Sequence, residues 1–371
     1  MKNTSRWKIN PKILIIIAIV AIVVAAVFLS TQTRGEDSLS EAVEGGELTL
    51  TSVGRNYESL TQFVQNDEEQ TRQLLEAARA ALENARAKFG SAQRTSDEYV
   101  LGMLGNFESV VQASDVMAQG VDNLLLVSKN LTDAIDYYRQ KEFEKASAQA
   151  SYCLTVLEPL LNDFETSNIA LSDINVVYIP SGQRDRLTLR IGQYGNEAAV
   201  YNQYVLLLRS ILEGEDYLKL NAQLEDLMRQ LQSAIANNDD QAAQDLRQQI
   251  SNILQQLRDP SYQNAAGTAS QLDPNSFSGA ASDAAQELRN KLRDLEGIDA
   301  FENYLQSLEK YLEAMRHFEQ GETAEAEQDI NEGLSILQGQ ATDQELEGLY
   351  AGLRQAFNTL ELRIKGQPPQ G

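Results

Sequence analysis

Apolar residues along most of this chain recur at intervals of three and four, and alternation at two is rare. This spacing places them on one face of an α-helix, so the pattern predicts an all-α protein from about residue 47 onward. The expected helices span 48–66, 68–89, 97–140, 183–213, 216–236, 240–258, 283–296, 298–319, 323–338 and 343–364, with another ending near 174. The stretch 175–180 instead has a composition typical of a β-strand.

Short polar turns separate several of these apolar stripes. Around the turn at 237–240 the stripes consist of Leu220, Leu224, Leu227, Leu231 and Ile235, then Leu246, Ile250, Ile253 and Leu257. Around Gly321 they consist of Leu305, Leu308, Leu312 and Met315, then Ile330, Leu334 and Leu337. A short turn forces two such stripes to face each other, so each pair predicts an antiparallel helical hairpin. A third turn, near Lys141, has the same construction.

Aromatic and small residues recur around two of these turns. The first set is Tyr137, Tyr138, Phe143, Ala146, Cys153 and Leu154, and the second is His317, Phe318, Gly321, Ala326, Gly333 and Leu334. At these positions the chain resembles the tetratricopeptide repeat, a helix-turn-helix module of about 34 residues that stacks into an α-solenoid. The module's Trp-Leu-Gly part is absent, and the three turns lie about 80 to 100 residues apart. A generic array or bundle of helical hairpins is therefore the alternative interpretation.

The N-terminal region carries a different signal. Ile13 to Leu29 contains no polar side chain, and 13–31 is long enough to cross a bilayer as a helix. Basic residues precede this segment and an acidic cluster at 36–44 follows it, so the sequence predicts an anchor with its N-terminus in the cytoplasm and the bulk of the chain outside the cell. A cleaved signal peptide is the alternative, although its apolar region is usually shorter.

Composition divides the chain further. The predicted parts are a cytoplasmic basic tail at 1–12, the transmembrane anchor at 13–31, a linker at 32–46, a helical domain at 47–180, helical hairpins at 181–258, a C-terminal helical unit at 283–365 and a tail at 366–371. Residues 259–282 are rich in Pro, Gly, Ser, Asn and Ala and have no sustained apolar period, so they predict a linker or a long functional loop.

Charge narrows the range of partners. After Lys12 the chain carries 27 basic and 54 acidic residues, and this field repels nucleic-acid phosphates and anionic lipid headgroups. We therefore expect no nucleic-acid partner. Cys153 is the only cysteine, which excludes an intrachain disulfide and predicts a small buried side chain. The acidity and the lack of disulfides are compatible with a prokaryotic host, bacterial or archaeal.

Catalytic signals are weak. His317 is the only histidine, which excludes a multi-histidine zinc site and any Ser-His-Asp arrangement not built on it. Acidic clusters fall at helix starts, where they favour the helix dipole, and none has the spacing of a calcium loop. The sequence therefore predicts no catalytic residue, no metal and no cofactor, and a structural role for His317.

Aromatic residues provide the candidate binding surface. Tyr311, Met315 and Phe318 line one helix face at spacings of four and three. The tetratricopeptide resemblance implies that this face points into a concave peptide-binding groove. Tyr137 and Tyr138 are further candidates, and core packing is the alternative for all five. The group Tyr194, Tyr201 and Tyr204 offers similar material.

One modification signal is present as well. Asn130 begins an N-glycosylation sequon, which matters in a host that glycosylates exported proteins.

Together these features predict a membrane-anchored, extracytoplasmic scaffold that binds proteins or its own copies and carries out no catalysis. A ligand-sensing ectodomain is the first alternative, and with only about 12 cytoplasmic residues it would act through a partner membrane protein. An extracytoplasmic hydrolase is the second, which the single histidine opposes.

Overall fold

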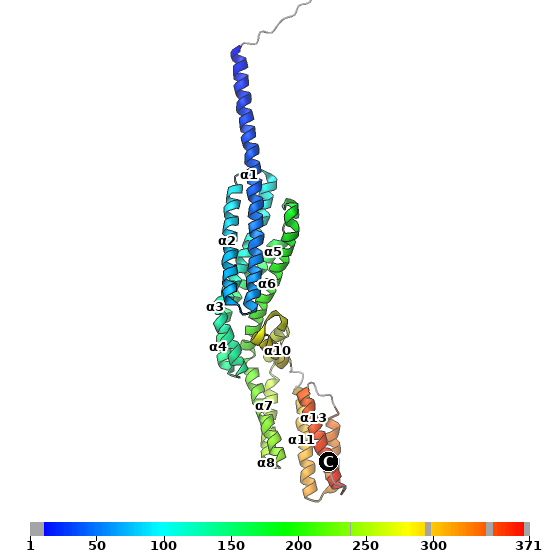
Figure 1. Ribbon diagram of the computed structural model, residues 1–371. Coiled ribbons are helices and arrows are strands. Elements are labelled where there is room, and N and C mark those ends of the chain that lie inside the picture. The colour runs from blue at the N-terminus through cyan, green and yellow to red at the C-terminus, as the bar shows by residue number, and fades with distance from the viewer. Residues whose placement is uncertain (1–10, 238, 294–297, 339–343, 367–371) are drawn as a thin grey trace, which may run out of the picture. The chain divides into compact units, whose positions relative to one another are not determined.

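The computed structural model describes residues 11–237, 239–293, 298–338 and 344–366, and it describes the side chains of residues 37–235, 237, 239, 241–292, 298–338 and 347–366 (Figure 1). Every regular element in this part of the chain is helical, which confirms the all-α fold class. The helices are α1 (Pro11–Val64), α2 (Glu68–Ala92), α3 (Glu98–Arg139), α4 (Phe143–Leu157), α5 (Leu161–Ser172), α6 (Ser181–Glu213), α7 (Glu215–Ala236), α8 (Asp240–Leu257), α9 (Tyr262–Ser270), α10 (Gly279–Arg293), α11 (Ile298–Glu319), α12 (Thr323–Ile336) and α13 (Gln344–Ile364). Short 3₁₀ helices are η1 (Glu158–Leu160), η2 (Val176–Tyr178) and η3 (Pro274–Ser276).

The chain divides into two compact units. Unit 1 comprises residues 1–126 and 157–202, and unit 2 comprises 127–156 and 203–371. Helices α3 and α6 each contribute residues to both units.

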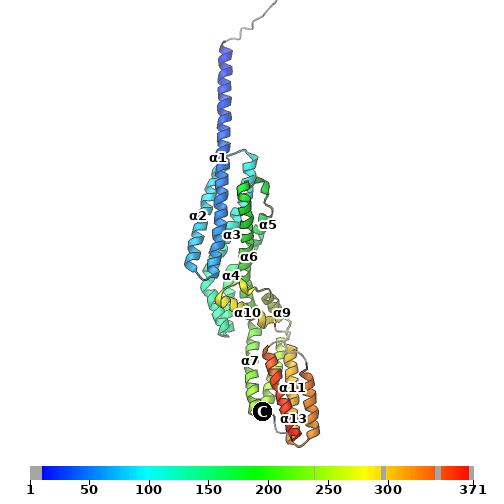
Figure 2. The ribbon, with the colours of Figure 1, turned by 45° about the vertical axis from the view of Figure 1, so that its right-hand side comes forward.

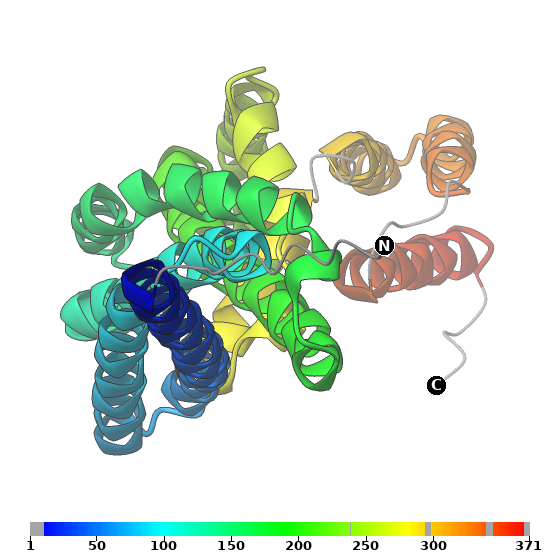
Figure 3. The ribbon, with the colours of Figure 1, turned by 90° about the horizontal axis from the view of Figure 1, so that it is seen from above.

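Unit 1 is a helical bundle in which α1 and α2 lie side by side (Figure 3). Its core contains a layer of buried polar side chains, most of them small, as well as large apolar side chains. The Ser52 hydroxyl donates to the Ala78 carbonyl at 2.7 Å, and the Asn56 amide donates to the Ser114 carbonyl at 2.9 Å. These three polar side chains are fully buried, and their bonds tie α1 to α2 and α3. Small side chains allow the helix backbones to approach closely enough for such bonds.

Two tyrosines of α6 fix the neighbouring segment in unit 1. The hydroxyl of Tyr194 donates to the Phe164 carbonyl at 2.9 Å, and that of Tyr201 donates to the Leu157 carbonyl at 3.0 Å. Both rings also pack against the Phe164 ring, with centroids 5.7 and 5.1 Å apart. Tyr194, Tyr201 and Tyr204 are all buried, so they are core residues and offer no surface for a partner.

Unit 2 contains the predicted hairpins. Helices α7 and α8 pack against each other, as do α11 and α12, and α13 packs on both members of the second pair (Figure 2). The helix bounds agree with those expected from the sequence to within a few residues. Gly333 allows α12 to approach α11 and α13 closely. The Ser307 hydroxyl of α11 donates to the Gly333 carbonyl at 2.8 Å, and a Cβ at position 333 would lie 2.2 Å from the Phe357 ring of α13.

The hairpin turns share one backbone geometry. Asn66, Lys141 and Gly321 have φ values of 63°, 61° and 81°, in the left-handed region. At the third turn the Gly321 amide donates to the Phe318 carbonyl at 3.1 Å and the Glu322 amide donates to the His317 carbonyl at 2.8 Å. This pair of bonds is the Schellman motif, which satisfies carbonyls at the end of a helix.

The other turns repeat this pattern at equivalent positions. Asp67 and Glu142 donate backward to Gln62 and Tyr137 at 3.0 and 2.9 Å, as Glu322 does to His317. At the fourth turn the Asp239 amide donates to the Ala234 carbonyl at 2.9 Å. The acidic residue that follows each reversal also stands at the start of the next helix, where negative charge is favourable. Asp67 and Asp239 accept bonds from the amides of that helix as well.

Two segments expected to be linkers are helical. Residues 32–46 belong to α1, and Ser38, Ala42, Gly45 and Gly46 are buried or closely packed. Gly45 and Gly46 make room for the rings of Phe89 and Phe107, which a Cβ at these positions would meet within 2.7 Å.

The segment 259–282 needs the same correction. It contains α9, η3 and the start of α10, and it buries Ala265, Ala269, Leu272 and Phe277, so it is neither a flexible linker nor an open loop. In the stretch 175–180, the expected β-like character is replaced by η2, in which the Val177 amide donates to the Asn175 side chain at 3.1 Å.

No helix whose side chains the structure describes is long and apolar enough to cross a membrane. The backbone of the predicted anchor at 13–31 lies within α1, but its side chains fall outside the described residues. The anchor therefore stays a prediction from the sequence.

The close approach at Gly333 gives a first prediction. Gly333→Ala should destabilise the protein by about 1–3 kcal/mol, because the added methyl group overpacks the contact with Phe357. Gly352→Ala, in α13, is the matched control, since a Cβ there meets no atom within 4 Å. It should stabilise the helix by about 0.5–1 kcal/mol, the usual difference between glycine and alanine in a helix interior. Urea unfolding measures both, and equal effects would contradict the packing described.

Candidate functional site

A groove of about 350 Å³ lies between α11 and α13 in unit 2. Its lining residues are Tyr311, Met315, Gly352, Gln355, Ala356, Thr359, Leu360 and Arg363. Two of the three residues predicted on the α11 face, Tyr311 and Met315, therefore line one groove. Phe318 is half-buried and is not among the lining residues. The Tyr311 ring also packs edge-to-face on Phe357, with centroids 5.4 Å apart, so it is partly a core residue.

Gly352 leaves the groove open. A Cβ at this position would have no neighbour within 4 Å, so no close helix contact requires a glycine here. Glycine in a helix interior costs about 0.5–1 kcal/mol relative to alanine. Its effect on the surface is to widen the groove beside Tyr311 and Met315, together with the small side chain of Ala356.

A larger groove, of about 640 Å³, lies among α7, α8, α11 and α13. Its apolar lining includes Leu224, Met228, Leu254, Leu257, Ile298, Phe301 and Leu349. Gly348 of α13 also lines it, and a Cβ there would again meet no atom within 4 Å. This volume falls within the range of about 300–1,000 Å³ that is typical of small-molecule sites.

Cationic side chains distinguish the larger groove from the acidic surface around it. Lys141, Arg229 and Lys291 all line it. The nitrogens of Lys141 and Lys291 lie 2.6 and 3.5 Å from the carboxylate of Glu225. Burial opposes ionisation of Glu225, but the hydrogen bond from Lys141 and the charge of Lys291 outweigh it and lower the pKa of this carboxyl. Lys291 also pairs with Glu287 at 2.9 Å and Arg229 pairs with Asp226 at 3.2 Å, so each of the three cations has a carboxylate partner.

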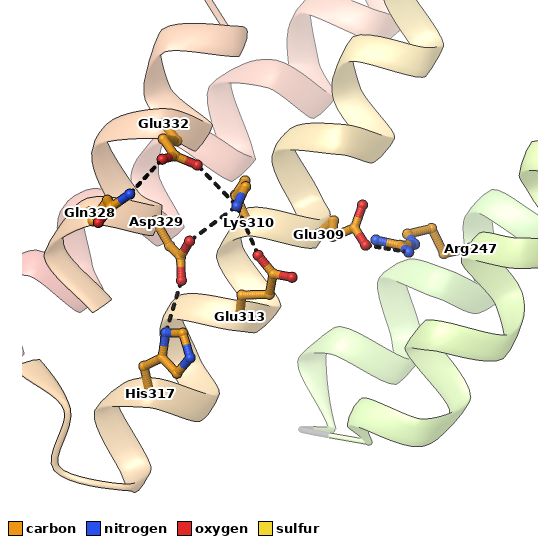
Figure 4. A network of polar contacts seen from close by, with 8 residues as sticks. All are labelled: Arg247, Glu309, Lys310, Glu313, His317, Gln328, Asp329 and Glu332. Carbon is orange, nitrogen blue, oxygen red and sulfur yellow. Dashed lines mark hydrogen bonds and ion pairs between the residues drawn. The ribbon is translucent and has the colours of Figure 1, made fainter. Parts of the chain in front are cut away.

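A polar network ties α11 to α12 on another face of α11 (Figure 4). The buried carboxylate of Asp329 lies 3.2 Å from the Lys310 nitrogen and 3.0 Å from His317 Nδ1. Lys310 also contacts Glu313 and Glu332, each at 3.0 Å, and these carboxylates raise the pKa of Lys310. Because His317 is held by Asp329 inside this network, its environment agrees with a structural role.

The candidates on α3 lie elsewhere in unit 2. Tyr138 is 2% exposed and its hydroxyl has no hydrogen-bond partner in the described part of the chain. Burial raises the pKa of this hydroxyl. Tyr138 is therefore a core residue, which corrects its assignment to a binding surface. Tyr137 is half-buried, and the Lys145 nitrogen lies 5.3 Å from the centroid of its ring. Neither tyrosine lines the two grooves.

Two further residues singled out by the sequence lie on α3 and α4. Asn130 is half-buried within α3, and its amide donates to the Gln149 side chain at 2.6 Å. The sequon thus belongs to a helix, and glycosylation stays a prediction. Cys153 is fully buried in α4, and burial raises the pKa of its thiol to about 12, which keeps it in the unreactive thiol form.

The sequence analysis missed Glu197, in the core of unit 1. This residue is 1% exposed, and neither carboxylate oxygen has a hydrogen-bond partner among the described residues. Burial raises the pKa of this carboxyl to about 8. A signal was present, because Glu197 continues the buried face of α6 at spacings of three from Tyr194 and four to Tyr201.

Within the described ranges, no group of three or more His, Cys, Asp or Glu residues could hold a metal ion. No protein-family model matches the chain, and comparison with curated proteins and with solved structures finds no match. The tetratricopeptide resemblance therefore rests on the residues quoted for it.

Glu197 gives a second prediction. Its pKa is about 8 in the folded protein and near 4.5 in the unfolded chain, so the unfolded state binds fewer protons between these values and stability falls as pH rises through this window. The loss across the whole window is on the order of 5 kcal/mol, at about 1.4 kcal/mol for each pKa unit. The glutamine side chain of Glu197→Gln cannot ionise, so this variant should lack the loss of stability that ionisation of Glu197 causes as pH rises.

Urea unfolding of both proteins at pH 5, 6.5 and 8 isolates the effect, because all other groups titrate alike. The glutamine variant should gain stability relative to the parent as pH rises. A constant difference between the two across this range would show that Glu197 is solvated or paired.

Proposed function

We propose that this chain is a membrane-anchored, extracytoplasmic helical scaffold that binds other proteins or copies of itself and carries out no catalysis. The segment 13–31 crosses the membrane, residues 1–12 stay in the cytoplasm, and the helical units lie outside the cell. The uninterrupted apolar run and the charges on either side of it support this arrangement.

The groove between α11 and α13 carries the proposal. It places the predicted Tyr311 and Met315 on one concave surface and is kept open by Gly352, which no internal contact requires. Tyrosine and methionine are enriched where proteins meet, since they bury large, adaptable surfaces.

The lining indicates what kind of segment would bind. Most of the surface that lines the groove is polar, with Gln355, Thr359 and Arg363 beside Tyr311, Met315 and Leu360, so it suits an amphipathic helix that presents polar and apolar side chains together. A carboxylate on the partner would pair with Arg363, which presents a bidentate fork. An acidic partner segment is thus recognised by apolar contact and one charged pair.

The hairpin construction supports a scaffold of tetratricopeptide-like character. Each hairpin buries only part of its apolar surface, so neighbouring hairpins cover one another and leave grooves between helices. The repeated reversal at 66, 141 and 321, with the equivalent bond at 239, is the element from which such a surface is built.

The larger groove favours a second candidate function. Its apolar walls suit a small amphiphile, whose acidic group would compete with Glu225, Asp226 and Glu287 for the cations Lys141, Arg229 and Lys291. The protein would then sense this ligand and transmit the signal through a partner membrane protein.

A third prediction separates the two functions. Gly352→Leu should fill the groove between α11 and α13, and Gly348→Leu should fill the larger one, because neither position has a neighbour within 4 Å of an added Cβ. Each variant controls for the other, since both add leucine to an open face of α13. Tagged full-length chains are compared by cross-linking mass spectrometry on native membranes, with thermal unfolding as a test of folding.

For a scaffold, one protein is captured by the parent and by Gly348→Leu, and its recovery falls at least tenfold with Gly352→Leu. For a sensor, an acidic amphiphile raises the melting temperature of the parent and of Gly352→Leu but not of Gly348→Leu. Equal capture by all three folded proteins would remove the support that the α11–α13 groove gives to the scaffold.

A further inference from the structure

Exposed apolar side chains gather at one end of unit 1. Four of them, here called the apolar rim, lie in the first turn of α3 and in η2: Tyr99, Leu101, Val176 and Val177, which are 36%, 46%, 54% and 65% exposed. Isolated exposed apolar residues are normal, but a contiguous group indicates a contact surface.

Local packing holds the two halves of the rim together. The Asn106 amide donates to the Asn175 carbonyl at 2.9 Å, and the Asn175 amide donates back to the Asn106 side chain at 3.0 Å. The ring of Tyr178 lies 6.1 Å from that of Tyr99 and fits against Gly102, where a Cβ would meet it at 2.5 Å. These contacts fix η2 onto the start of α3, so the exposure of Val176 and Val177 is built into the fold.

The register of α3 against α1 locates the rim along the bundle. Phe107 of α3 packs on Gly46 of α1, and about two turns further along both helices the Ser114 hydroxyl hydrogen-bonds to that of Ser52. The two helices therefore run in the same direction, and residues at the same level differ in number by about 61. The same offset places Tyr99 level with Ser38, which is the first buried residue described in α1. The starts of α3 and α6 accordingly lie at the end of unit 1 from which α1 projects (Figure 1, Figure 2).

This end faces the bilayer if the proposed anchor is correct. Because α1 is one helix from Pro11 to Val64, Thr31 and Ser38 are separated by about 10 Å at a rise of 1.5 Å per residue. The headgroup layer extends roughly 5–8 Å beyond the hydrocarbon on each side. A transmembrane helix is tilted by about 20° on average, which lowers a neighbouring helix 8–10 Å away by roughly 3 Å. The rim thus reaches the headgroup layer.

We propose, resting on the membrane anchor of the proposed function, that the apolar rim docks unit 1 on the interfacial layer of the bilayer that holds α1. Tyrosine suits the headgroup layer, because its apolar ring faces the lipid and its hydroxyl reaches water, as in aromatic belts. The valines contribute apolar contact. Leu39 of α1 and Ile169 in the last turn of α5 are also exposed and extend the apolar material at this end.

Charge indicates which lipids are involved. Asp97 and Glu98 stand at the start of α3 beside the rim and Asp173 lies shortly before η2, while Arg94 and Arg184 are cations at this end, the latter donating to the Ile179 carbonyl. Anionic headgroups would be repelled by this acidic edge, so the rim contacts zwitterionic lipid through apolar burial and not through headgroup charge.

Nitroxide spin labels measure this contact directly. Cys153 is fully buried, so the wild-type chain is an unlabelled background and single cysteines can be introduced without removing it. Val177→Cys reports on the rim. Leu126→Cys is the matched control, since Leu126 and Val177 belong to the same unit and are each 65% exposed, and Leu126 lies 27 residues of α3 away from Tyr99. Ala21→Cys reports on the anchor.

Full-length proteins are reconstituted into phosphatidylcholine vesicles, and each label's accessibility to oxygen and to a water-soluble nickel chelate is measured by power saturation. The label at 177 should be several-fold less accessible to nickel than the label at 126. Adding phosphatidylglycerol to the vesicles should not lower the nickel accessibility at 177 any further. A label at 21 that is open to nickel would refute the anchor itself. A label at 21 in hydrocarbon with equal nickel access at 177 and 126 would overturn the docking proposal. Spin–spin broadening at 177 would assign the rim to a second copy of the chain and overturn it as well.

Discussion

The reversal of the chain at the end of a helix is the constraint on which the rest of the structure depends. At the turns of Asn66, Lys141 and Gly321 the last carbonyls of one helix are satisfied by two amides that point backward, and this requires one residue in the left-handed region. Glycine adopts this backbone without steric cost, whereas a residue with a side chain pays on the order of 1 kcal/mol. The chain nevertheless uses Asn66 and Lys141 as well as Gly321. The turn geometry is therefore specified by the helices that it joins as much as by the turn residue.

Close helix approach is the second requirement, and small residues meet it in both units. Gly45 and Gly46 admit the rings of Phe89 and Phe107 in unit 1, and Gly333 admits Phe357 in unit 2. Where glycines have no such neighbour, as at 348 and 352, the same residue type leaves a groove at the surface. Glycine thus has two opposite uses in this fold, and only the neighbours of each position distinguish them.

This distinction also explains how far the sequence could be interpreted. Apolar periodicity predicted the helices and the hairpins at 141, 238 and 321, because the residues on the buried face of a helix recur at fixed spacings within that helix. The linker expected at 32–46 and the linker or long loop expected at 259–282 are helical instead. Gly45 packs against Phe89, which is distant in sequence, and Ala265 is fully buried although the residues around it are rich in Pro, Gly, Ser and Asn. At the candidate site, the spacing of Tyr311 and Met315 identified one helix face, but the partner face on α13 depends on tertiary structure. Tyr138 was misassigned because the same spacing describes a buried face.

The continuity of α1 has a mechanical consequence. Residues 32–46 make about four helical turns with no hinge between the apolar run and the packed part of the bundle. A rotation of the segment 13–31 about its axis would turn α1 within unit 1 by the same angle, and a vertical shift of one turn would carry the bundle along by about 5 Å. Insertion of a single residue before Ser38 would likewise rotate the bundle by about 100° relative to everything that precedes it. In this protein α1 continues from the apolar run into the bundle as one helix, so the orientation of unit 1 follows that of the segment 13–31.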